Sequence, residues 1–212
     1  MSFPEAVLFD LDGTLINTEI YYQRAYYEAG KALGYPLSKE QCLTLRSLDR
    51  RIADVYFEKL FGDPNAGEKL RKKRDELMLG TPVIAKKGAH ELALELRKRG
   101  IPYCVCSASP FDVIAKNLAK AGLGEDYKTY YSARDVSFGK PAPDIYLSVC
   151  EKLAINPKNA LAVEDTPNGF QSAYDAGLNV IFCVDMTEPD DFIKEHAFKV
   201  VYSLYEIIPL LP

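Results

Sequence analysis

Two aspartates separated by one leucine follow a short apolar run near the start of the chain. Residues 6–9 read Ala-Val-Leu-Phe, and Asp10-Leu11-Asp12-Gly13-Thr14 comes directly after them. Continued extension would turn Asp10 and Asp12 to the same side, and Gly13 lets the chain bend away. One carboxylate could then act as a nucleophile while its neighbour serves as general acid and base. The alternative is a turn that the aspartates cap, because Asp-Gly is a common turn pair.

Two further polar segments could handle a phosphate group. Ser107 and Ala108 follow the apolar run 103–106, and Lys140 lies in a loop that contains glycine and proline. Phosphoryl transfer depends mainly on positioning and charge neutralisation, which the Ser107 hydroxyl, the Ala108 amide and the Lys140 ammonium group could provide together. Each has a plainer alternative, since Ser107 could cap a helix near Pro110 and Lys140 could be a solvated loop lysine.

A pair of acids, Glu164 and Asp165, follows the apolar run 160–163. Magnesium prefers hard oxygen ligands and keeps several waters, so a site built from Asp10 and Asp165 with few other protein ligands is chemically sensible. A metal ion would also reduce the repulsion between a nucleophilic carboxylate and a phosphate dianion. The plainer alternative is that the two acids cap a helix that begins near Pro167.

The elements that must position these residues alternate along the chain. Short apolar runs end in polar or glycine-bearing residues, and stretches with helical spacing follow most of them. We therefore predict an α/β fold with a Rossmann-like parallel sheet, in which three of the polar segments lie at the carboxyl ends of strands, where ligands gather. The expected strands are residues 6–9, 103–106, 160–163, 180–184 and 200–202, and the expected helices are residues 88–98, 111–121, 145–153 and 169–176.

Residues 17–81 interrupt this alternation. They are rich in Tyr, Lys, Arg, Glu and Leu, have helical character throughout and contain no convincing strand. A helical insertion after the first strand is the simplest account. We predict a Rossmann-like core domain formed by residues 1–16 and 82–212, and a helical cap domain formed by residues 17–81.

Composition and charge restrict the class of protein. The 212 residues are 48% hydrophobic and 26% charged, which is typical of a globular protein with a substantial core. The formal net charge of −4 argues against a nucleic acid or an anionic membrane surface as partner. The five cysteines are odd in number, and we expect them to be reduced packing thiols. With no leader-like start and no run of about 20 apolar residues, we expect a cytoplasmic monomer that binds a small anionic molecule.

The four motifs together resemble those of the haloacid dehalogenase superfamily. Residues 9–15, Phe-Asp-Leu-Asp-Gly-Thr-Leu, are similar to its first motif, and residues 106–109, 139–144 and 163–169 are similar to its second, third and fourth. They occur in the order of the family and span nearly the whole chain. The insertion after the first motif resembles the cap of the subgroup that includes phosphoglycolate phosphatase and β-phosphoglucomutase.

The resemblance implies a role for each motif residue. Asp10 would be the nucleophile that forms an aspartyl phosphate, and Asp12 would be the general acid and base. The implied phosphate-binding residues are Ser107, Ala108, Ser109 and Lys140. The implied Mg²⁺ ligands are the Asp10 side chain, the Asp12 backbone carbonyl, Asp165 and Glu164, the last either directly or through water.

The insertion carries the residues that would choose the substrate. By similarity Arg50 is the best placed to bind the substrate anion, although Arg46, Lys73 and Arg74 are further candidates. Related sugar-phosphate mutases carry a proton-shuttling His at a position where this chain has Tyr22, so we expect a phosphatase for a phosphorylated small molecule: a sugar phosphate, phosphoglycolate or a nucleotide. The alternatives are a β-phosphoglucomutase-type mutase, a phosphorylation-receiver module and a catalytically quiet binding protein on the same scaffold.

Overall fold

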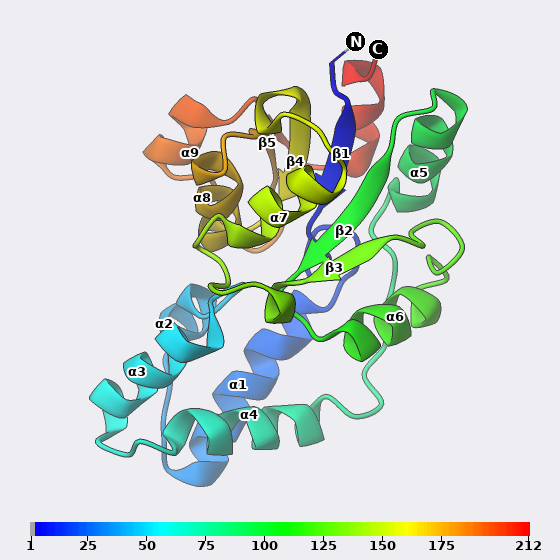
Figure 1. Ribbon diagram of the computed structural model, residues 1–212. Coiled ribbons are helices and arrows are strands. Elements are labelled where there is room, and N and C mark those ends of the chain that lie inside the picture. The colour runs from blue at the N-terminus through cyan, green and yellow to red at the C-terminus, as the bar shows by residue number, and fades with distance from the viewer. Residues whose placement is uncertain (1–2) are drawn as a thin grey trace.

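A six-stranded parallel sheet forms the centre of the molecule. The computed structural model describes residues 3–212, and its strands lie in the order β3-β2-β1-β4-β5-β6 (Figure 1). Every neighbouring pair is parallel. The α/β, Rossmann-like prediction is therefore confirmed. The strands are β1 (Ala6–Phe9), β2 (Tyr103–Ser107), β3 (Tyr130–Ser132), β4 (Ala160–Glu164), β5 (Asn179–Cys183) and β6 (Lys199–Val201).

Helices cover both faces of the sheet because the central strands are apolar on both sides. Val7 and Phe9 of β1 belong to one buried cluster, whereas Ala6 and Leu8 belong to another. The first cluster is completed by α5 (Ala89–Lys98), α6 (Phe111–Lys120) and the 3-10 helix η3 (Leu204–Leu210). The second is completed by α7 (Asp144–Lys152), α8 (Pro167–Asp175) and α9 (Asp191–His196). Two short 3-10 helices, η1 (Ala133–Asp135) and η2 (Pro157–Asn159), connect strands to helices.

The predicted strands and helices occur within two residues of their expected bounds, but strand β3 and helix α9 were not among the predictions. Strand β3 (Tyr130–Ser132) was not expected from the sequence. It has only three residues, its two tyrosines are half-buried, and it pairs with β2 alone at the sheet edge. All five cysteines are free and buried, as expected for packing thiols. Among residues 3–212, none of the helices combines the length and the apolar composition that crossing a membrane requires.

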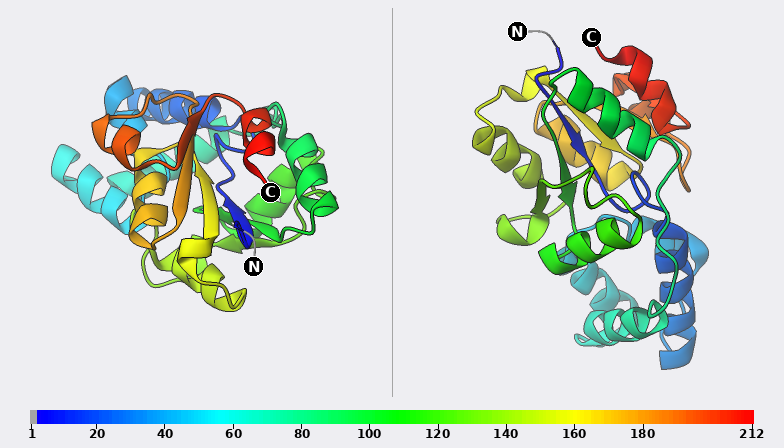
Figure 2. Two further views of the ribbon diagram at one scale, coloured as in Figure 1. Left: turned by 90° about the horizontal axis from the view of Figure 1, so that it is seen from above. Right: turned by 90° about the vertical axis from the view of Figure 1, so that its right-hand side faces the viewer.

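Four helices of the inserted segment lie between β1 and α5. They are α1 (Glu19–Leu33), α2 (Lys39–Thr44), α3 (Arg50–Phe61) and α4 (Ala66–Leu77). Their apolar faces form a separate buried cluster around Phe57 and Leu70. The views agree that these helices lie beyond the carboxyl ends of the strands (Figures 1 and 2). The stretch 17–81 is thus helical, as predicted, and the domain limits at 16/17 and 81/82 stay a prediction.

Candidate active site

The polar motifs meet at the carboxyl ends of three neighbouring strands. Strand β1 lies between β2 and β4, so Asp10, Ser107 and Glu164 follow or end adjacent strands. The amide of Asp10 still donates a hydrogen bond to the Val163 carbonyl oxygen at 2.9 Å, which continues the β1–β4 pairing past the last residue of β1. The rigid sheet therefore fixes the positions of these side chains.

Lys140 is the cation of this cluster, and it is completely buried. Its Nζ lies 2.6 Å from Asp10 Oδ1 and 2.6 Å from Glu164 Oε1, and it donates to the Cys106 carbonyl oxygen at 3.1 Å. An ammonium group has three protons, so these partners use all of them. The hydroxyl of Tyr146 donates a further hydrogen bond to Glu164 Oε1. The interpretation of Lys140 as a solvated loop lysine is therefore wrong.

Three buried carboxylates crowd together beside Lys140. Asp10, Glu164 and Asp165 each offer an oxygen atom, and these atoms lie within 4.8 Å of one another. Two of their oxygens, Asp10 Oδ2 and Glu164 Oε2, are buried without a hydrogen-bond partner among residues 3–212. Burial raises the pKa of Glu164 to about 7, against the opposing effect of Lys140. Free carboxylate oxygens in a cluster with surplus negative charge fit a hard divalent cation such as Mg²⁺.

Two glycines allow the backbone to approach these acids closely. Gly13 has a φ of 94°, in the left-handed region, and a Cβ there would lie 2.2 Å from Asp165 Oδ2. A Cβ on Gly169 would lie 1.9 Å from Glu164 Oε2. Any other residue at either position would displace a carboxylate, so the glycines of the first and fourth motifs are steric requirements of the acid cluster.

Asp12 is held by two hydroxyl groups. Thr18 Oγ1 donates to Asp12 Oδ1 at 2.5 Å, and Ser109 Oγ donates to Asp12 Oδ2 at 3.2 Å. Burial is the main cause that raises the pKa of Asp12 to about 6, and the nearby charge of Asp10 contributes in the same direction. Asp12 is thus bound by two hydroxyl groups, whereas Asp10, two residues away, contacts the Lys140 ammonium group.

The plainer interpretations of the other motif residues are also wrong. Helix α6 begins after Pro110 without a side-chain cap, and Ser107 Oγ instead accepts a hydrogen bond from the Ser109 amide at 3.1 Å. Helix α8 is capped by Thr166, whose Oγ1 accepts from the Gly169 amide at 3.0 Å. Glu164 and Asp165 are thus left free of a capping role.

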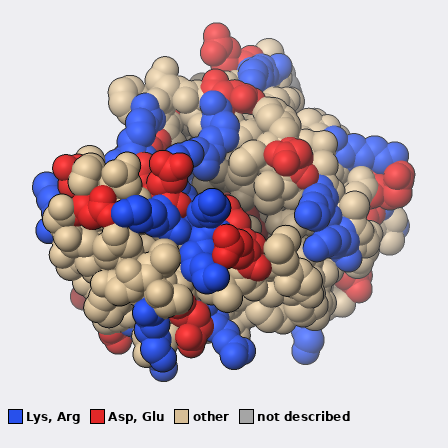
Figure 3. Space-filling view, turned by 90° about the horizontal axis from the view of Figure 1, so that it is seen from below, with Lys and Arg blue, Asp and Glu red and all other residues tan. Residues whose placement is uncertain are grey.

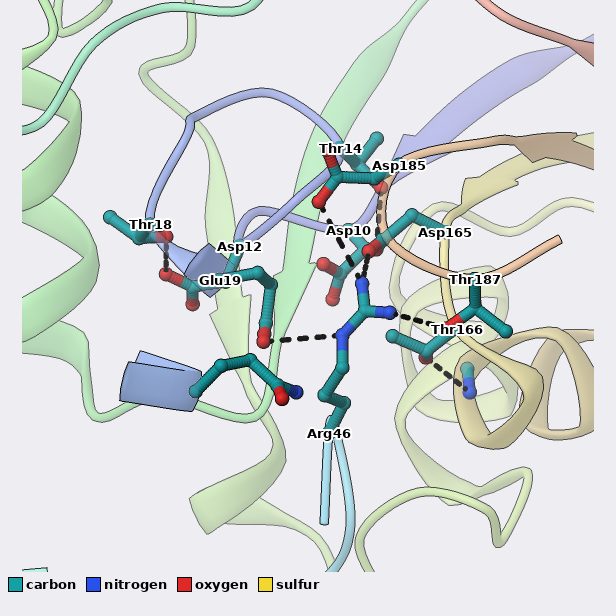
Figure 4. Close-up of polar contacts among 12 residues, drawn as sticks. Asp10, Asp12, Thr14, Thr18, Glu19, Arg46, Asp165, Thr166, Asp185 and Thr187 are labelled. Atoms are coloured by element: carbon teal, nitrogen blue, oxygen red, sulfur yellow. Dashed lines mark hydrogen bonds and ion pairs between the residues drawn. The ribbon is translucent and has the colours of Figure 1, made fainter. Parts of the chain in front are cut away.

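Arg46 enters this site from the inserted helices. It follows α2 in the chain, and its guanidinium group lies between acids of both regions (Figure 4). Arg46 Nη2 donates to Asp165 Oδ2, and Arg46 Nε lies 3.2 Å from Glu19 Oε2. Arg46 Nη1 donates to Thr187 Oγ1 at 2.8 Å, and Asp185 Oδ2 lies 3.9 Å from Nη2. The arginine is buried, with 4% of its surface exposed.

The segment around Arg46 is fixed to the sheet side by backbone contacts as well. Asn168 Nδ2 donates to the Arg46 carbonyl oxygen at 2.8 Å. The Asp49 amide donates to the Lys140 carbonyl oxygen at 2.7 Å, and an Asp49 carboxylate oxygen accepts from the Gly139 amide at 2.6 Å. The inserted helices therefore lie against the third and fourth motifs.

Arg50 occupies a different position from Arg46. It lines the cavity that opens over Asp10 and Asp12, its side chain is about half exposed, and its Nε lies 3.7 Å from Asp54 Oδ2. Its predicted role in binding the substrate stays a prediction, as do the roles of the motif residues. Ser107, Ala108, Ser109 and Lys140 line the same cavity.

Several site contacts were missed by reasoning from the sequence. Thr14 Oγ1 donates to Asp165 Oδ1 at 3.1 Å, and Thr18 and Tyr146 donate to Asp12 and Glu164. The position of Thr14 within the first motif is a usable signal. Tyr146 offers none, because only the packing of α7 against the sheet brings its hydroxyl to Glu164.

Comparison with known proteins agrees with this geometry. Residues 4–177 match the family described as haloacid dehalogenase-like hydrolase. Validoxylamine A 7'-phosphate phosphatase of Streptomyces hygroscopicus subsp. limoneus is 30% identical over 191 residues, which cover 88% of this chain and 87% of that protein. Hexitol phosphatase B of Escherichia coli strain K12 is 27% identical over 191 residues, which cover 85% of this chain and 85% of that protein.

A solved structure supports the fold independently. The crystal structure of a hydrolase from Pseudomonas syringae superimposes with a TM-score of 0.85 at 22% sequence identity, covering 97% of this chain and 96% of that one. The family match spans all four motifs and the inserted helices between the first and second. The chain therefore belongs to the haloacid dehalogenase-like hydrolase family and is a hydrolytic enzyme of that family.

Proposed function

We propose that this hydrolase is a Mg²⁺-dependent phosphatase that cleaves a small phosphate monoester through an aspartyl phosphate on Asp10. The observation that carries the proposal is the buried trio Asp10, Glu164 and Asp165, with two unpartnered oxygens, beside the fully buried Lys140. The names of the related phosphatases support the reaction class. In this proposal residues 17–81 form a cap domain over a core domain of residues 1–16 and 82–212.

Asp10 has the geometry of a nucleophile. Lys140 binds Asp10 Oδ1, and Asp10 Oδ2 has no hydrogen-bond partner among residues 3–212. In the proposed first step a carboxylate oxygen of Asp10 attacks phosphorus in line with the ester oxygen, a P–O bond forms and the ester P–O bond breaks. Ser107, the Ala108 amide and Lys140 would bind the other phosphate oxygens and neutralise their charge.

Asp12 is positioned to move the protons. Its carboxyl group is fixed by Thr18 and Ser109 and lines the same cavity as Asp10. It would donate a proton to the leaving ester oxygen, and then take one from the water that attacks the aspartyl phosphate. The second step releases inorganic phosphate and restores the Asp10 carboxylate.

The residues that would hold the metal are Asp10, Glu164 and Asp165, together with the predicted carbonyl ligand of Asp12. When bound, Mg²⁺ supplies positive charge that offsets the repulsion between the Asp10 carboxylate and the phosphate oxygens. Asp165 is kept in place by the Thr14 hydroxyl at 3.1 Å. Glu164 is kept in place by Lys140 and Tyr146.

Tyr22 supports hydrolysis over transfer within a sugar phosphate. It lines the same cavity as Asp12. By the resemblance to the family, it stands where related mutases carry a histidine. Burial, followed by the charge of Asp12, raises the pKa of the Tyr22 phenol well above its ordinary value of 10. A phenol that keeps its proton at neutral pH is a poor shuttle, so water is the better supported acceptor of the phosphoryl group.

The test is the replacement of Asp10 by Asn, which preserves the shape of the side chain. We expect Asp10→Asn to lower kcat/KM for p-nitrophenyl phosphate with Mg²⁺ by about 1000-fold or more. Asp175→Asn is the matched control, because Asp175 is exposed and does not line the cavity over Asp10 and Asp12. Circular dichroism checks that both variants are folded. Normal turnover by folded Asp10→Asn protein would remove Asp10 from the mechanism.

A further inference from the structure

The guanidinium group of Arg46 faces two acids of the sheet side, and only one of them belongs to the proposed metal site. Arg46 Nη2 donates to Asp165 Oδ2, and Asp185 Oδ2 lies 3.9 Å from the same nitrogen atom. Figure 4 shows the two carboxylates beside the same end of the arginine. A small rotation of the guanidinium group would therefore bring Nη2 from Asp165 to Asp185 while the inserted helices stay in place.

Asp165 is the acid of the trio whose two oxygens are both engaged. Thr14 Oγ1 donates to Asp165 Oδ1 at 3.1 Å, and Arg46 donates to Asp165 Oδ2. By contrast, Asp10 Oδ2 and Glu164 Oε2 have no hydrogen-bond partner among residues 3–212. A guanidinium group and a divalent cation on one carboxylate repel each other. Arg46 and the proposed Mg²⁺ therefore compete for Asp165.

Asp185 lies outside the four sequence motifs, in the loop that follows β5. Lys86 Nζ binds its Oδ1, and the Lys86 amide donates to the Leu15 carbonyl oxygen at 2.8 Å, so the lysine is itself held in place. Among residues 3–212, Asp185 Oδ2 accepts no hydrogen bond, and it lies 3.9 Å from Arg46. Lys86 thus neutralises and orients Asp185 and leaves one oxygen free for Arg46.

The other contacts of Arg46 do not involve the acid trio. Thr187, in the same loop as Asp185, accepts from Arg46 Nη1 at 2.8 Å, and Arg46 Nε lies 3.2 Å from Glu19 Oε2. Asn168 Nδ2 donates to the Arg46 carbonyl oxygen at 2.8 Å. These contacts hold the arginine against the sheet side whichever acid its Nη2 binds, so only one partner would have to change.

The exposed charges of the inserted helices do not replace these buried contacts. On the face seen from below, Lys and Arg side chains are intermixed with Asp and Glu around a hollow (Figure 3). Exposed ion pairs contribute little because water and salt screen them. A buried guanidinium group that lost Asp165 and found no other acid would carry an uncompensated charge. Metal binding would then favour movement of the inserted helices away from the sheet.

We propose that Asp185 is a positioning residue that binds Arg46 when Mg²⁺ binds Asp165, so that the inserted helices can stay against the sheet in the metal-loaded protein. The inference rests on the proposed function for the metal site. Asp185 contacts neither the acid trio nor the reacting atoms in this proposal and acts only through Arg46. Without it, Mg²⁺ would bind at the expense of an ion pair between the inserted helices and the sheet.

Calorimetric titration with Mg²⁺ tests this in four proteins: the wild type, Asp185→Asn, Arg46→Met and the double variant. We expect Asp185→Asn to weaken Mg²⁺ binding by about 3- to 10-fold when Arg46 is present, because Arg46 then has only Asp165 to bind. In Arg46→Met protein the same change should alter the affinity by less than about 2-fold. Lys86 already neutralises Asp185, so the direct pull of Asp185 on the ion is small.

Asp126→Asn is the matched control. Asp126 is also a partly buried aspartate that pairs with a cation, Arg97 Nη2 at 2.9 Å, but it lies outside the cavity over Asp10 and Asp12. Its Mg²⁺ affinity should equal that of the wild type. Urea denaturation in EDTA checks that all the variants are folded. Unchanged Mg²⁺ affinity in Asp185→Asn protein, or an equal loss with and without Arg46, overturns the proposal.

Turnover separates this inference from the proposed function. If the four proteins show the expected affinities but the wild type releases no phosphate from p-nitrophenyl phosphate, the phosphatase assignment fails and the role of Asp185 stands. If the wild type binds Mg²⁺ and hydrolyses the ester but Asp185→Asn protein binds Mg²⁺ equally well, the phosphatase stands and the role of Asp185 fails. A wild type that binds no Mg²⁺ contradicts both.

Discussion

Two buried cations neutralise the acids of this site, and they come from different regions of the molecule. Lys140 contacts Asp10 and Glu164 from the sheet side, at 2.6 Å each. Arg46 contacts Asp165 and Glu19 from the inserted helices. The partners of Lys140 are fixed by neighbouring strands of one sheet, so its contacts persist as long as the sheet is folded. Arg46 keeps its contact with Asp165 only while the inserted helices lie against the sheet.

The positive charge of Lys140 is therefore always present at the acids, whereas that of Arg46 is present only when the inserted helices lie against the sheet. An acid that depends on Lys140 is neutralised in every arrangement of the folded core. Asp165 loses a cation whenever the inserted helices move away, and it is also one of the three acids that fit a metal. The comparison therefore predicts that Lys140 is needed for folding and chemistry together, whereas Arg46 adjusts metal binding and closure.

The largest effect should come from Lys140→Met. It removes the ammonium group that Asp10, Glu164 and the Cys106 carbonyl oxygen share. We expect kcat/KM for p-nitrophenyl phosphate to fall by about 1000-fold or more, because the proposed phosphate site would lose its ammonium group. We also expect the free energy of unfolding to fall by about 3–5 kcal/mol, as for other broken buried ion pairs. Urea denaturation and steady-state kinetics measure the two effects.

Lys98→Met is the matched control for that change. Lys98 pairs with Glu95 at 2.8 Å on the exposed face of α5, and exposed pairs contribute about 0–1 kcal/mol. Lys140→Arg keeps the charge but not the size of the side chain, so it should recover part of the stability and little of the activity. An unchanged free energy of unfolding in Lys140→Met protein would show that the contacts of Lys140 with Asp10 and Glu164 do not stabilise the folded sheet.

The same comparison explains which parts of the site the sequence could reveal. Asp10, Ser107 and Glu164 lie at or just after the ends of apolar strands, and both the strand and its end are local patterns. The parallel sheet then brings those ends together by topology alone. Arg46 and Asp165 are 119 residues apart, and their contact depends on how four helices are placed over the sheet. No local pattern distinguishes Arg46 from the other arginines of that segment.

The parts of the fold that the sequence did not predict also depend on tertiary contacts. Strand β3 is three residues long, and its tyrosines are half-buried, so it gives no apolar run. Its place follows from pairing with β2, which is a tertiary contact. The buried hydroxyl of Tyr146 is likewise set by the packing of a helix rather than by its neighbours in sequence. Chemistry at strand ends was predictable, whereas contacts made by packing were not.

An intermediate effect on activity is expected for Arg46→Met. The variant should bind Mg²⁺ more tightly but turn over substrate less efficiently. Removing the guanidinium group takes a positive charge away from Asp165, so Mg²⁺ should bind roughly 3- to 30-fold more tightly. Closure loses its central ion pairs, so kcat/KM should fall by about 10- to 100-fold. Calorimetric titration with Mg²⁺ and steady-state kinetics measure the two quantities separately.

Arg51→Met provides the control for this variant. Arg51 is also an arginine of the inserted helices, but its side chain is mostly exposed and pairs with Asp49 at 2.8 Å, away from the acid trio. Its Mg²⁺ affinity should equal that of the wild type. If Arg46→Met instead weakened Mg²⁺ binding, Arg46 would be a support for the metal site and its charge would not compete with the ion.

The smallest effect on activity should come from Glu19→Gln, because Gln keeps an oxygen that can accept from Arg46 Nε. We expect kcat/KM to change by about 3-fold or less. The free energy of unfolding of the wild type should depend on pH through the Glu19 carboxyl group. The variant has no such group and should lack this part of the pH dependence. Burial is the main cause that raises the pKa of Glu19 from 4.5 to about 8, while Arg46 acts in the opposite direction.

The sign of that dependence follows from proton linkage. Because the folded state binds a proton that the unfolded state releases above pH 4.5, wild-type stability is present at low pH and is lost as the pH rises through about 8. Relative to Glu19→Gln, the wild type should lose about 1–3 kcal/mol of unfolding free energy between pH 5 and pH 8.5. Urea denaturation of both proteins at several pH values, with EDTA present, measures the difference. A constant difference across that range would mean that Arg46, which follows α2, holds Glu19 of α1 ionised in the folded protein.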